Sequence, residues 1–455
     1  MGNMRIPACF KAYDIRGRVP DELNPLLARD IGRAFAALFA PRKVAVGRDI
    51  RLSSESLTEA LISGLLESGV DVLDLGLCGT EEIYHAAFSL EQEGLDGGIV
   101  VTASHNPTDY NGMKLVTGGA RPVTGESGLK AMAEMIVSGR LPQLSATQGR
   151  RSSVSSKEGY IRHLLDSVDT ATLKSLKLVV NSGNGCAGAI IDLLEPHLPF
   201  TFIKAYHEPD GTFPHGVPNP LLPEKREETA RLVREHGADL GIAWDGDFDR
   251  CFFWDAQGNF IEGYYIVGLL ALELLAQEPG GTILHDPRLI WNTRELVEGA
   301  GGVPVMTRTG HAFIKERMRQ EDAIYGGEMS AHHYFRDFGY CDSGMIPWLL
   351  VCSLLSRKNT TLASLVAERI AAYPVSGEIN SVVDDPEAAI ARVKAQFAQG
   401  EEDDTDGLSM TFPDFRFNIR KSNTEPLLRL NVESRNDPML LAEKTRELLA
   451  LIREK

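Results

Sequence analysis

Short apolar runs alternate with amphipathic segments along most of the chain. Four of these runs, at residues 44–47, 98–102, 240–244 and 282–285, have the length and character of buried β-strands. The segment between the first two, residues 53–68, has apolar residues at helical spacing instead. Regular alternation of strands and helices is typical of α/β layers with a mostly parallel sheet. The pattern therefore predicts α/β domains over most of the chain.

Capping residues mark the ends of several predicted helices. Asn24-Pro25 and Asp437-Pro438 each place a good N-cap residue before a proline at the first helical position. Gly69 follows residues 53–68 and is expected as the residue just beyond that helix. These signals predict a helix from residue 25 to about residue 40 and a final helix that begins at residue 438.

The pattern changes near residue 374, after which strand-like pieces and two helices follow one another. The acidic stretch at 401–406 is interpreted as a solvated loop, because a run of charge normally faces water. The Ser-, Gln- and Arg-rich stretch at 143–157 is interpreted as a linker. We therefore predict four domains, at residues 1–152, 153–257, 258–373 and 374–455.

The composition limits the classes of function that remain open. With 455 residues the chain is long enough for three or four domains, and 43% hydrophobic residues are typical of a globular protein. There are 47 Lys and Arg residues against 63 Asp and Glu residues, which gives a net charge of −16. Such a surface repels nucleic acid and anionic membranes, so neither is expected as a partner. A small anionic substrate would need a local basic cleft.

The cysteines and the apolar stretches predict a cytoplasmic protein. No Cys-x-x-Cys pair occurs, which favours reduced core thiols over a disulfide framework. The N-terminal residues contain no apolar run of signal-peptide length. The most apolar stretches, 266–276 and 346–355, are too short to span a bilayer and predict buried helices. The six cysteines are Cys9, Cys78, Cys186, Cys251, Cys341 and Cys352.

The first candidate for chemistry is a polar segment that follows the strand at 98–102. It begins Thr102-Ala-Ser104-His-Asn-Pro107 and continues to Lys114. The carboxyl end of a strand in an open α/β sheet is where ligands usually bind, and Asn-Pro predicts a turn around Ser104. A plain polar turn would have the same composition. No Gly-x-Ser-x-Gly elbow is present, which disfavours a hydrolase serine.

The second candidate is Asp245-Gly-Asp247-Phe-Asp249-Arg250, at the end of the strand at 240–244. Three carboxylates at alternate positions of a loop can converge on one hard cation through oxygen atoms. The loop is no EF-hand, since its sixth position is Arg250 and its twelfth is Ala256. An acidic turn is the alternative, but the spacing favours a Mg²⁺ site.

A third motif predicts a different function. Gly183-Asn-Gly185-Cys-Ala-Gly188 matches the dinucleotide fingerprint, follows a predicted strand and opens a helix. An NAD-dependent oxidoreductase therefore remains an alternative. A tight strand-to-helix turn that needs small residues explains the glycines equally well.

Two further loops offer polar side chains. The loop at 326–333 has Glu328, Ser330 and two adjacent histidines, which suit sugar hydroxyls or else packing and capping. Adjacent histidines on a strand point apart, so a metal shared by both is not expected. Arg420-Lys-Ser422-Asn-Thr424 offers many donors and suits a phosphate, or is a plain polar turn.

Together these segments resemble one family, the α-D-phosphohexomutases, and within it the bacterial phosphomannomutase/phosphoglucomutase branch. The likeness extends from about residue 9 to residue 435. The resemblance implies three related α/β domains with mixed sheets and a C-terminal TATA-binding-protein-like α+β domain around a central cleft. The motifs that carry it are Lys11-Ala-Tyr13-Asp-Ile-Arg16-Gly17, Thr102-Ala-Ser104-His-Asn-Pro107, Asp245-Gly-Asp247-Phe-Asp249-Arg250, Gly327-Glu328-Met-Ser330-Ala-His332 and Arg420-Lys-Ser422-Asn-Thr424.

The resemblance also implies roles for individual residues. Ser104 matches the serine that carries a phosphoryl group and contributes a metal ligand, and Arg288 stands where related enzymes often have Lys. The implied Mg²⁺ ligands besides Ser104 are Asp245, Asp247 and Asp249. The other implied catalytic residues are Arg16, Lys114, Arg250 and His332. The implied substrate-binding residues are Tyr13, His105, Arg288, Thr309, Gly310, His311, Glu328, Ser330, Arg420, Ser422, Asn423 and Thr424.

The activity implied is the reversible conversion of mannose 6-phosphate and mannose 1-phosphate, with glucose phosphates as further substrates. Hexose 1,6-bisphosphate would be both intermediate and activator, and the enzyme would be a monomer or a weak dimer. Met329 stands where the phosphoglucosamine branch usually has Gln, which predicts poor use of glucosamine phosphate. A sugar-phosphate phosphatase and a non-catalytic sugar-phosphate-binding module remain alternatives beside the oxidoreductase.

Overall fold

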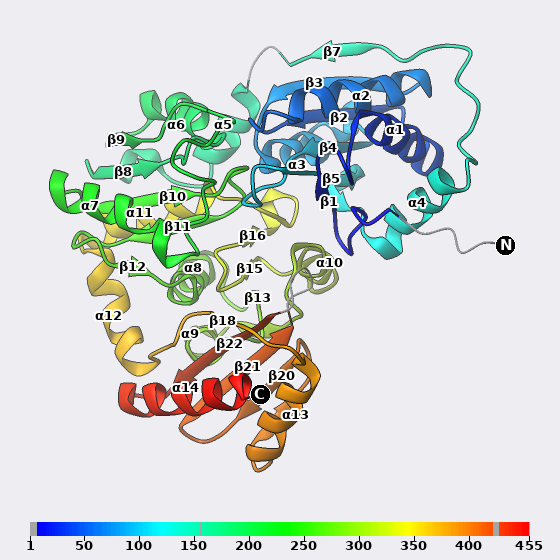
Figure 1. The fold of residues 1–455 in the computed structure, drawn as a ribbon. Coiled ribbons are helices and arrows are strands. Elements are labelled where there is room, and N and C mark those ends of the chain that lie inside the picture. The colour runs from blue at the N-terminus through cyan, green and yellow to red at the C-terminus, as the bar shows by residue number, and fades with distance from the viewer. Residues whose placement is uncertain (1–6, 155–156, 422–426, 455) are drawn as a thin grey trace. The chain divides into compact units, whose positions relative to one another are not determined.

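The computed structural model of the chain describes residues 7–154, 157–421 and 427–454 (Figure 1). The chain divides into two compact units. The first comprises Met1–Phe260 and His332–Asn359, and the second comprises Ile261–Ala331 and Thr360–Lys455.

The first unit has two α/β sheets and a short hairpin. Its strands are β1 (Ile15–Arg18), β2 (Lys43–Arg48), β3 (Asp71–Leu77), β4 (Gly97–Val101), β5 (Tyr110–Thr117), β6 (Arg121–Pro122), β7 (Arg151–Ser153), β8 (Lys177–Asn181), β9 (Thr201–Ala205), β10 (Leu240–Trp244), β11 (Cys251–Trp254), β12 (Phe260–Ile261), β16 (His333–Phe335) and β17 (Cys341–Asp342). Its α-helices are α1 (Pro25–Phe39), α2 (Ser54–Glu67), α3 (Thr80–Ser89), α4 (Lys130–Val137), α5 (Glu158–Leu165), α6 (Ala187–Leu194), α7 (Glu227–His236) and α11 (Ile346–Lys358).

Both sheets of the first unit are mixed. The first has the order β1–β5–β4–β2–β3–β7, with β6 beside β5. Strand β2 is parallel to β3 and β4, whereas β5 is antiparallel to β1 and β4. The second has the order β12–β11–β10–β8–β9, with β8 parallel to β9 and β10 and with β11 antiparallel. The central strands β4 and β10 are buried along their whole length, so the segments that follow them leave the sheet from a fixed position.

The second unit contains a parallel group of strands and an antiparallel sheet. Strand β13 is parallel to β14 and β15, while the antiparallel sheet has the order β18–β22–β21–β20–β19 and packs its core against α13 and α14. Its elements are α8 (Gly263–Gln277), β13 (Thr282–His285), α9 (Trp291–Gly299), β14 (Val303–Met306), α10 (His311–Glu321), β15 (Tyr325–Gly327), α12 (Leu362–Ala372), β18 (Ile379–Val382), α13 (Pro386–Gln396), β19 (Glu401–Asp403), β20 (Leu408–Thr411), β21 (Phe415–Lys421), β22 (Leu427–Ser434) and α14 (Pro438–Arg453).

The predicted helix ends are confirmed. The side chain of Asn24 accepts a hydrogen bond from the amide of Leu27, and Asp437 caps α14 in the same way through the amides of Met439 and Leu440. Gly69 follows α2 with a φ of 82°, a conformation that favours glycine. Sequence signals therefore placed these helices correctly because a cap is a local interaction.

Two predictions about irregular segments are wrong in part. Residues Glu401–Asp403 of the expected acidic loop form β19, an edge strand antiparallel to β20. Charged residues are common on an edge strand, where one side of the backbone faces water. The expected linker at 143–157 contains β7, which extends the first sheet beside β3. Arg151 holds β7 through ion pairs to Asp74 (2.6 Å) and Glu59 (2.8 Å).

Two expectations from composition can be compared with the structure directly. All six cysteines are buried and without disulfide partners. Among the helices of the described residues, none combines the length and the apolar character that a membrane crossing requires.

Helices α1 and α2 pack so closely that two glycines are needed at their contact. A Cβ atom added to Gly64 would lie 2.0 Å from the carbonyl oxygen of Arg29, and one added to Gly32 would lie 2.5 Å from that of Leu61. Because backbone atoms cannot move aside as a side-chain end can, an added methyl group must separate the two helices.

We therefore expect Gly64→Ala to destabilise the first unit by about 2 kcal/mol through overpacking. Gly159→Ala is the matched control, since Gly159 lies in α5 and a Cβ there meets nothing within 4 Å. The control should be neutral or slightly stabilising, because Ala favours a helix more than Gly does. Urea unfolding followed by circular dichroism measures both variants. Equal stability of Gly64→Ala and wild type would contradict the overpacking argument.

Candidate active site

Ser104 lies in a tight turn directly beyond β4 and is only 4% exposed. Its φ of 46° is in the left-handed region, and the amide of Asn106 donates to the carbonyl of Ala103 to close the turn. The hydroxyl of Ser104 donates a hydrogen bond of 2.7 Å to Oδ2 of Asp245. The structure therefore brings the predicted serine and the predicted acidic loop into direct contact.

Two arginines hold this turn in place. Arg16 donates to the carbonyl of Ala103 (2.8 Å) and to Oδ1 of Asn106 (2.6 Å). Arg51 is buried and donates to the carbonyls of Ser104 (2.9 Å) and Asn106 (2.6 Å). Sequence reasoning assigned Arg16 to the site but missed Arg51. The available signal was its position, since Arg51 follows the strand predicted at 44–47 as Ser104 follows the strand predicted at 98–102.

The three aspartates of the acidic loop converge between β10 and β11. One carboxylate oxygen from each of Asp245, Asp247 and Asp249 lies within 4.8 Å of the other two, and all three side chains are buried. Oδ1 of Asp247 and Oδ1 of Asp249 are buried without a hydrogen-bond partner among the described residues. Buried acceptors are rarely left unsatisfied, and clustered carboxylate oxygens are the ligands of hard divalent cations. The residues therefore fit a metal ion.

Two buried cations offset part of this negative charge. Nζ of Lys114 lies 2.8 Å from Oδ2 of Asp247 and also contacts Asp249. Nη2 of Arg250 lies 2.9 Å from Oδ2 of Asp245. Both residues were predicted for this site, and the structure places both in it.

The same contacts shift the ionisation of the loop. Burial alone would raise the pKa of Asp247, but Lys114 and a neighbouring hydroxyl hold that pKa well below its usual range. Burial and the charge of Asp247 raise the pKa of Asp249. Burial would lower the pKa of Lys114, yet Asp247 and Asp249 raise it, so Lys114 is charged at neutral pH.

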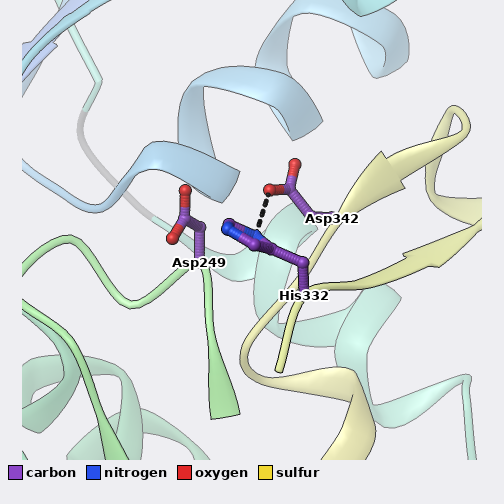
Figure 2. Close-up of side chains that lie close together, drawn as sticks. All are labelled: Asp249, His332 and Asp342. Carbon is purple, nitrogen blue, oxygen red and sulfur yellow. Dashed lines mark hydrogen bonds and ion pairs between the residues drawn. The ribbon is translucent and has the colours of Figure 1, made fainter. Parts of the chain in front are cut away.

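His332 lies beside this loop and is oriented by Asp342 (Figure 2). Nδ1 of His332 lies 3.0 Å from Oδ2 of Asp342, and the imidazole stacks on the ring of Tyr334. Burial would lower the pKa of His332, but Asp249 and Asp342 raise it. One ligand atom from each of His332, Asp249 and Asp342 also lies within 4.8 Å of the others, a second group that could hold a metal.

Asp342 was missed because only the pairing of the hairpin brings it to this position. In the antiparallel pair of β16 and β17, Asp342 lies opposite Tyr334, which is two residues after His332. His333 is buried in β16, where burial lowers its pKa to about 3, and it belongs to neither metal-ligand group.

Two further predicted residues lie in the first unit. Nδ1 of His105 lies 3.0 Å from the Ser104 hydroxyl, and Arg250 contacts the same imidazole. Burial and the charges of Arg250 and Arg16 lower the pKa of His105 well below its usual value, so the ring is neutral. Tyr13 is half-buried in the segment before β1.

In the second unit, Arg288 forms ion pairs with three carboxylates. Its guanidinium makes a two-pronged contact with Asp286 (3.1 and 2.8 Å) and lies 3.4 Å from Oε1 of Glu328. Nη2 also donates to the hydroxyl of Ser330 (3.2 Å), and Nη1 lies 3.6 Å from Glu378. The structure thus groups Arg288 with two predicted residues of the sugar loop, Glu328 and Ser330. It adds Asp286 and Glu378, which sequence reasoning missed.

Other predicted substrate-binding residues of the second unit lie beside this group. Arg420 donates to the hydroxyl of Thr309 (2.8 Å) and to Glu378 (3.3 Å). The amide of Gly310 donates to Oε1 of Glu328 (3.3 Å), and His311 begins α10. The predicted Ser422, Asn423 and Thr424 lie outside the described residues.

The glycines of the dinucleotide-like motif lie where other backbone segments pack too closely to leave room for a Cβ atom. A Cβ on Gly185 would lie 2.7 Å from the carbonyl oxygen of Gly246, and one on Gly188 would lie 2.2 Å from that of His207. A Cβ on Gly246 would in turn lie 2.6 Å from the carbonyl oxygen of Ser104. These small residues let three loops pack backbone against backbone, which explains the motif without a bound dinucleotide.

Comparison with known families covers nearly the whole chain. Four models of the phosphoglucomutase/phosphomannomutase family match in order. They are alpha/beta/alpha domain I at residues 7–136, domain II at 158–258, domain III at 262–373 and the C-terminal domain at 378–450.

Individual relatives extend over the full length. A phosphomannomutase of Salmonella montevideo is 59% identical over 452 residues, which span 98% of each chain. The phosphomannomutase of Escherichia coli strain K12 is 56% identical over 459 residues, spanning 99% of this chain and 100% of the relative. A solved phosphoglucomutase/phosphomannomutase family protein from Burkholderia thailandensis is 32% identical with a TM-score of 0.86, covering 98% of this chain and 97% of the other.

We expect a divalent cation to stabilise the first unit, because it would relieve repulsion among the buried carboxylates. At a concentration 100 times its dissociation constant, a ligand that binds only the folded state adds about 2.7 kcal/mol. Thermal unfolding in MgCl₂ and in chelator should therefore differ for wild type, and Asp247→Asn should lose most of that difference. Asp404→Asn, an exposed control, should keep it. An unchanged shift in Asp247→Asn would contradict the assignment of the loop.

Proposed function

This chain belongs to the phosphoglucomutase/phosphomannomutase family, and we propose that it interconverts mannose 6-phosphate and mannose 1-phosphate, with glucose phosphates as further substrates. One observation supports the proposal above all. The hydroxyl of a strained, clamped serine, Ser104, is hydrogen-bonded to a buried triplet of aspartates that is flanked by Lys114 and Arg250. The relatives named phosphomannomutase that match over the full length support the choice of substrate.

We propose Mg²⁺ as the cation of the aspartate triplet, with Asp245, Asp247 and Asp249 as its ligands beside phosphorylated Ser104. Oxygen ligands in small number, completed by a phosphate, are typical of Mg²⁺. A phosphoserine adds about −1.5 to −2 charges to a site that already has three carboxylates. When bound, Mg²⁺ would offset that repulsion and stabilise charge on the transferring phosphoryl group.

The proposed reaction consists of two phosphoryl transfers. A hydroxyl of the bound hexose monophosphate attacks the phosphorus of phospho-Ser104, the bond from phosphorus to Oγ breaks, and a hexose 1,6-bisphosphate results. After this intermediate turns around, Oγ of Ser104 takes back the other phosphoryl group and the isomeric monophosphate remains. The same bisphosphate would act as activator by phosphorylating Ser104 of an idle enzyme.

The residues around Ser104 suit the charges and protons of these steps. Lys114 and Arg250 provide positive charge beside the aspartate triplet that Ser104 contacts. Arg16 fixes the turn that contains Ser104. The attacking hydroxyl must lose a proton, and His332 is the candidate to accept it. Asp342 holds the imidazole of His332 in one orientation.

In the second unit we assign the group around Arg288 to the sugar and the group around Arg420 to the non-reacting phosphate. Glu328, Ser330 and His311 would bind hydroxyls together with Arg288. Thr309 and Gly310 would act with Arg420 and with Ser422, Asn423 and Thr424. The domain boundaries at 152, 257 and 373, the monomer or weak dimer and the cytoplasmic location remain predictions.

We expect Ser104→Ala to lose mutase activity by about 1,000-fold or more, because it removes the atom that carries the phosphoryl group. A coupled assay from mannose 1-phosphate measures activity, and intact mass should show roughly 80 Da of phosphate on wild type but not on the variant. Ser182→Ala is the control, since that buried hydroxyl has no hydrogen-bond partner among the described residues. Normal isomerisation by Ser104→Ala would contradict the mechanism. Net release of inorganic phosphate by wild type would favour a phosphatase.

We expect Glu328→Gln to lower kcat/KM for mannose and glucose phosphates by similar factors. The change removes a charge that holds Arg288 and the amide of Gly310, and lost hydrogen bonds to charged groups cost about 1.5–3 kcal/mol, or roughly 10- to 100-fold. Assays with both 1-phosphates measure the two ratios, with the exposed Glu298→Gln as control. Loss with one sugar alone would make Glu328 a selective reader of that sugar and refute shared recognition.

A further inference from the structure

Thr80, the first residue of α3, makes two hydrogen bonds to Asp247 of the acidic loop, called the metal loop below. Its amide donates to the backbone carbonyl of Asp247 (3.1 Å), and its hydroxyl donates to Oδ2 of the same residue (2.5 Å). Lys114 donates to the Thr80 hydroxyl in turn (3.4 Å), and Thr80 is fully buried. A residue that the family-model match places in domain I thus fixes both the backbone and the carboxylate of a residue in domain II.

The turn that presents Thr80 is itself fixed from both sides. A Cβ on Gly79 would lie 2.1 Å from the ring of Phe248, so this turn lies directly against the metal loop. Oε2 of the buried Glu81 accepts hydrogen bonds from the amides of Gly344 (2.6 Å) and Met345 (3.3 Å), and Tyr160 donates to the other oxygen. Thr80 therefore has little freedom to follow Asp247 if that carboxylate rotates.

The two carboxylate oxygens of Asp247 have different surroundings. Oδ2 receives the Thr80 hydroxyl and the Lys114 ammonium, whereas Oδ1 is buried without a hydrogen-bond partner among the described residues. A carboxylate held by one oxygen presents the other in a fixed direction. Partners of this kind, which orient a metal ligand, typically contribute 10- to 100-fold to metal affinity.

We propose that Thr80 is a positioning residue of the cation site, whose hydroxyl orients Asp247 so that Oδ1 is available to the divalent cation. This inference rests on the proposed assignment of the aspartate triplet to the metal. Sequence reasoning passed over Thr80, because nothing local distinguishes it from an ordinary residue at the start of a helix.

Three variants separate the hydroxyl from the shape of the side chain. Thr80→Val keeps the shape and removes the hydroxyl, Thr80→Ser keeps the hydroxyl, and Thr80→Ala removes the hydroxyl without demanding space. Thr58→Val is the matched control, since Thr58 is a buried threonine of the same unit whose hydroxyl has no hydrogen-bond partner among the described residues. Mn²⁺ binding to chelator-treated full-length protein, followed by electron paramagnetic resonance, measures affinity without any turnover. Intact mass ensures that all samples have the same phosphorylation at Ser104.

We expect Mn²⁺ to bind Thr80→Val and Thr80→Ala about 10-fold more weakly than wild type. Thr80→Ser should stay within about threefold, and Thr58→Val should equal wild type. If Thr80→Val does not fold, the comparison of Thr80→Ala with Thr80→Ser decides. Wild-type affinity in a variant without the hydroxyl, or an equal loss in Thr80→Ser, would overturn the proposal. A wild type that binds Mn²⁺ but forms no isomer would refute the proposed function and leave this inference standing.

Discussion

Three carboxylates lie close together in a buried loop of the first unit, and contacts from three other segments of the chain hold them there. Asp245, Asp247 and Asp249 would repel one another strongly at this depth, because burial removes the screening of water. Lys114 and Arg250 offset part of the charge, and two carboxylate oxygens that are left without a hydrogen bond among the described residues could hold a cation. The loop therefore concentrates negative charge, and the repulsion among its carboxylates depends on which cations lie beside it.

Close backbone packing determines where the serine meets this charge. The turn of Ser104 rests on Gly246, and Gly246 rests on Gly185, with no room for a Cβ at either glycine. The three loops come from the ends of three buried strands, β4, β10 and β8. Side chains between the loops would separate the hydroxyl of Ser104 from Asp245 by more than a hydrogen bond. The glycines thus set the distance over which phosphoryl transfer is proposed, and the dinucleotide-like spacing is a consequence of that packing.

Features that depend on residues close together in the chain were predicted from the sequence, whereas features that depend on distant residues were missed. Helix caps such as Asn24 and Asp437, and strands such as β10 and β13, follow from local pattern and were predicted correctly. Edge strands β7 and β19 were predicted as irregular segments, because their polar sequences lack a strand pattern. They become strands only by pairing with β3 and β20.

The same division applies to the candidate site. Ser104 and the aspartate triplet stand in compact motifs at strand ends, which a reader of the sequence can find. Arg51 and Thr80 act on residues far away in the chain, and Asp342 reaches His332 only through the pairing of β16 with β17. Their roles therefore follow from the fold alone.

The second unit balances charge differently, and this bears on how it would treat a sugar phosphate. Arg288 and Arg420 are cations that could attract a phosphate at long range, but each is already paired, with Asp286 and Glu378 among the partners. Arg288 has a planar guanidinium that Asp286 grips through two nitrogens, a geometry that the ammonium group of Lys cannot reproduce. Pairing of this kind holds the donors at fixed angles instead of leaving them as a diffuse positive field. Recognition by such a group depends on the match of hydrogen bonds to the ligand, and shared hydroxyls of two sugars would satisfy it equally.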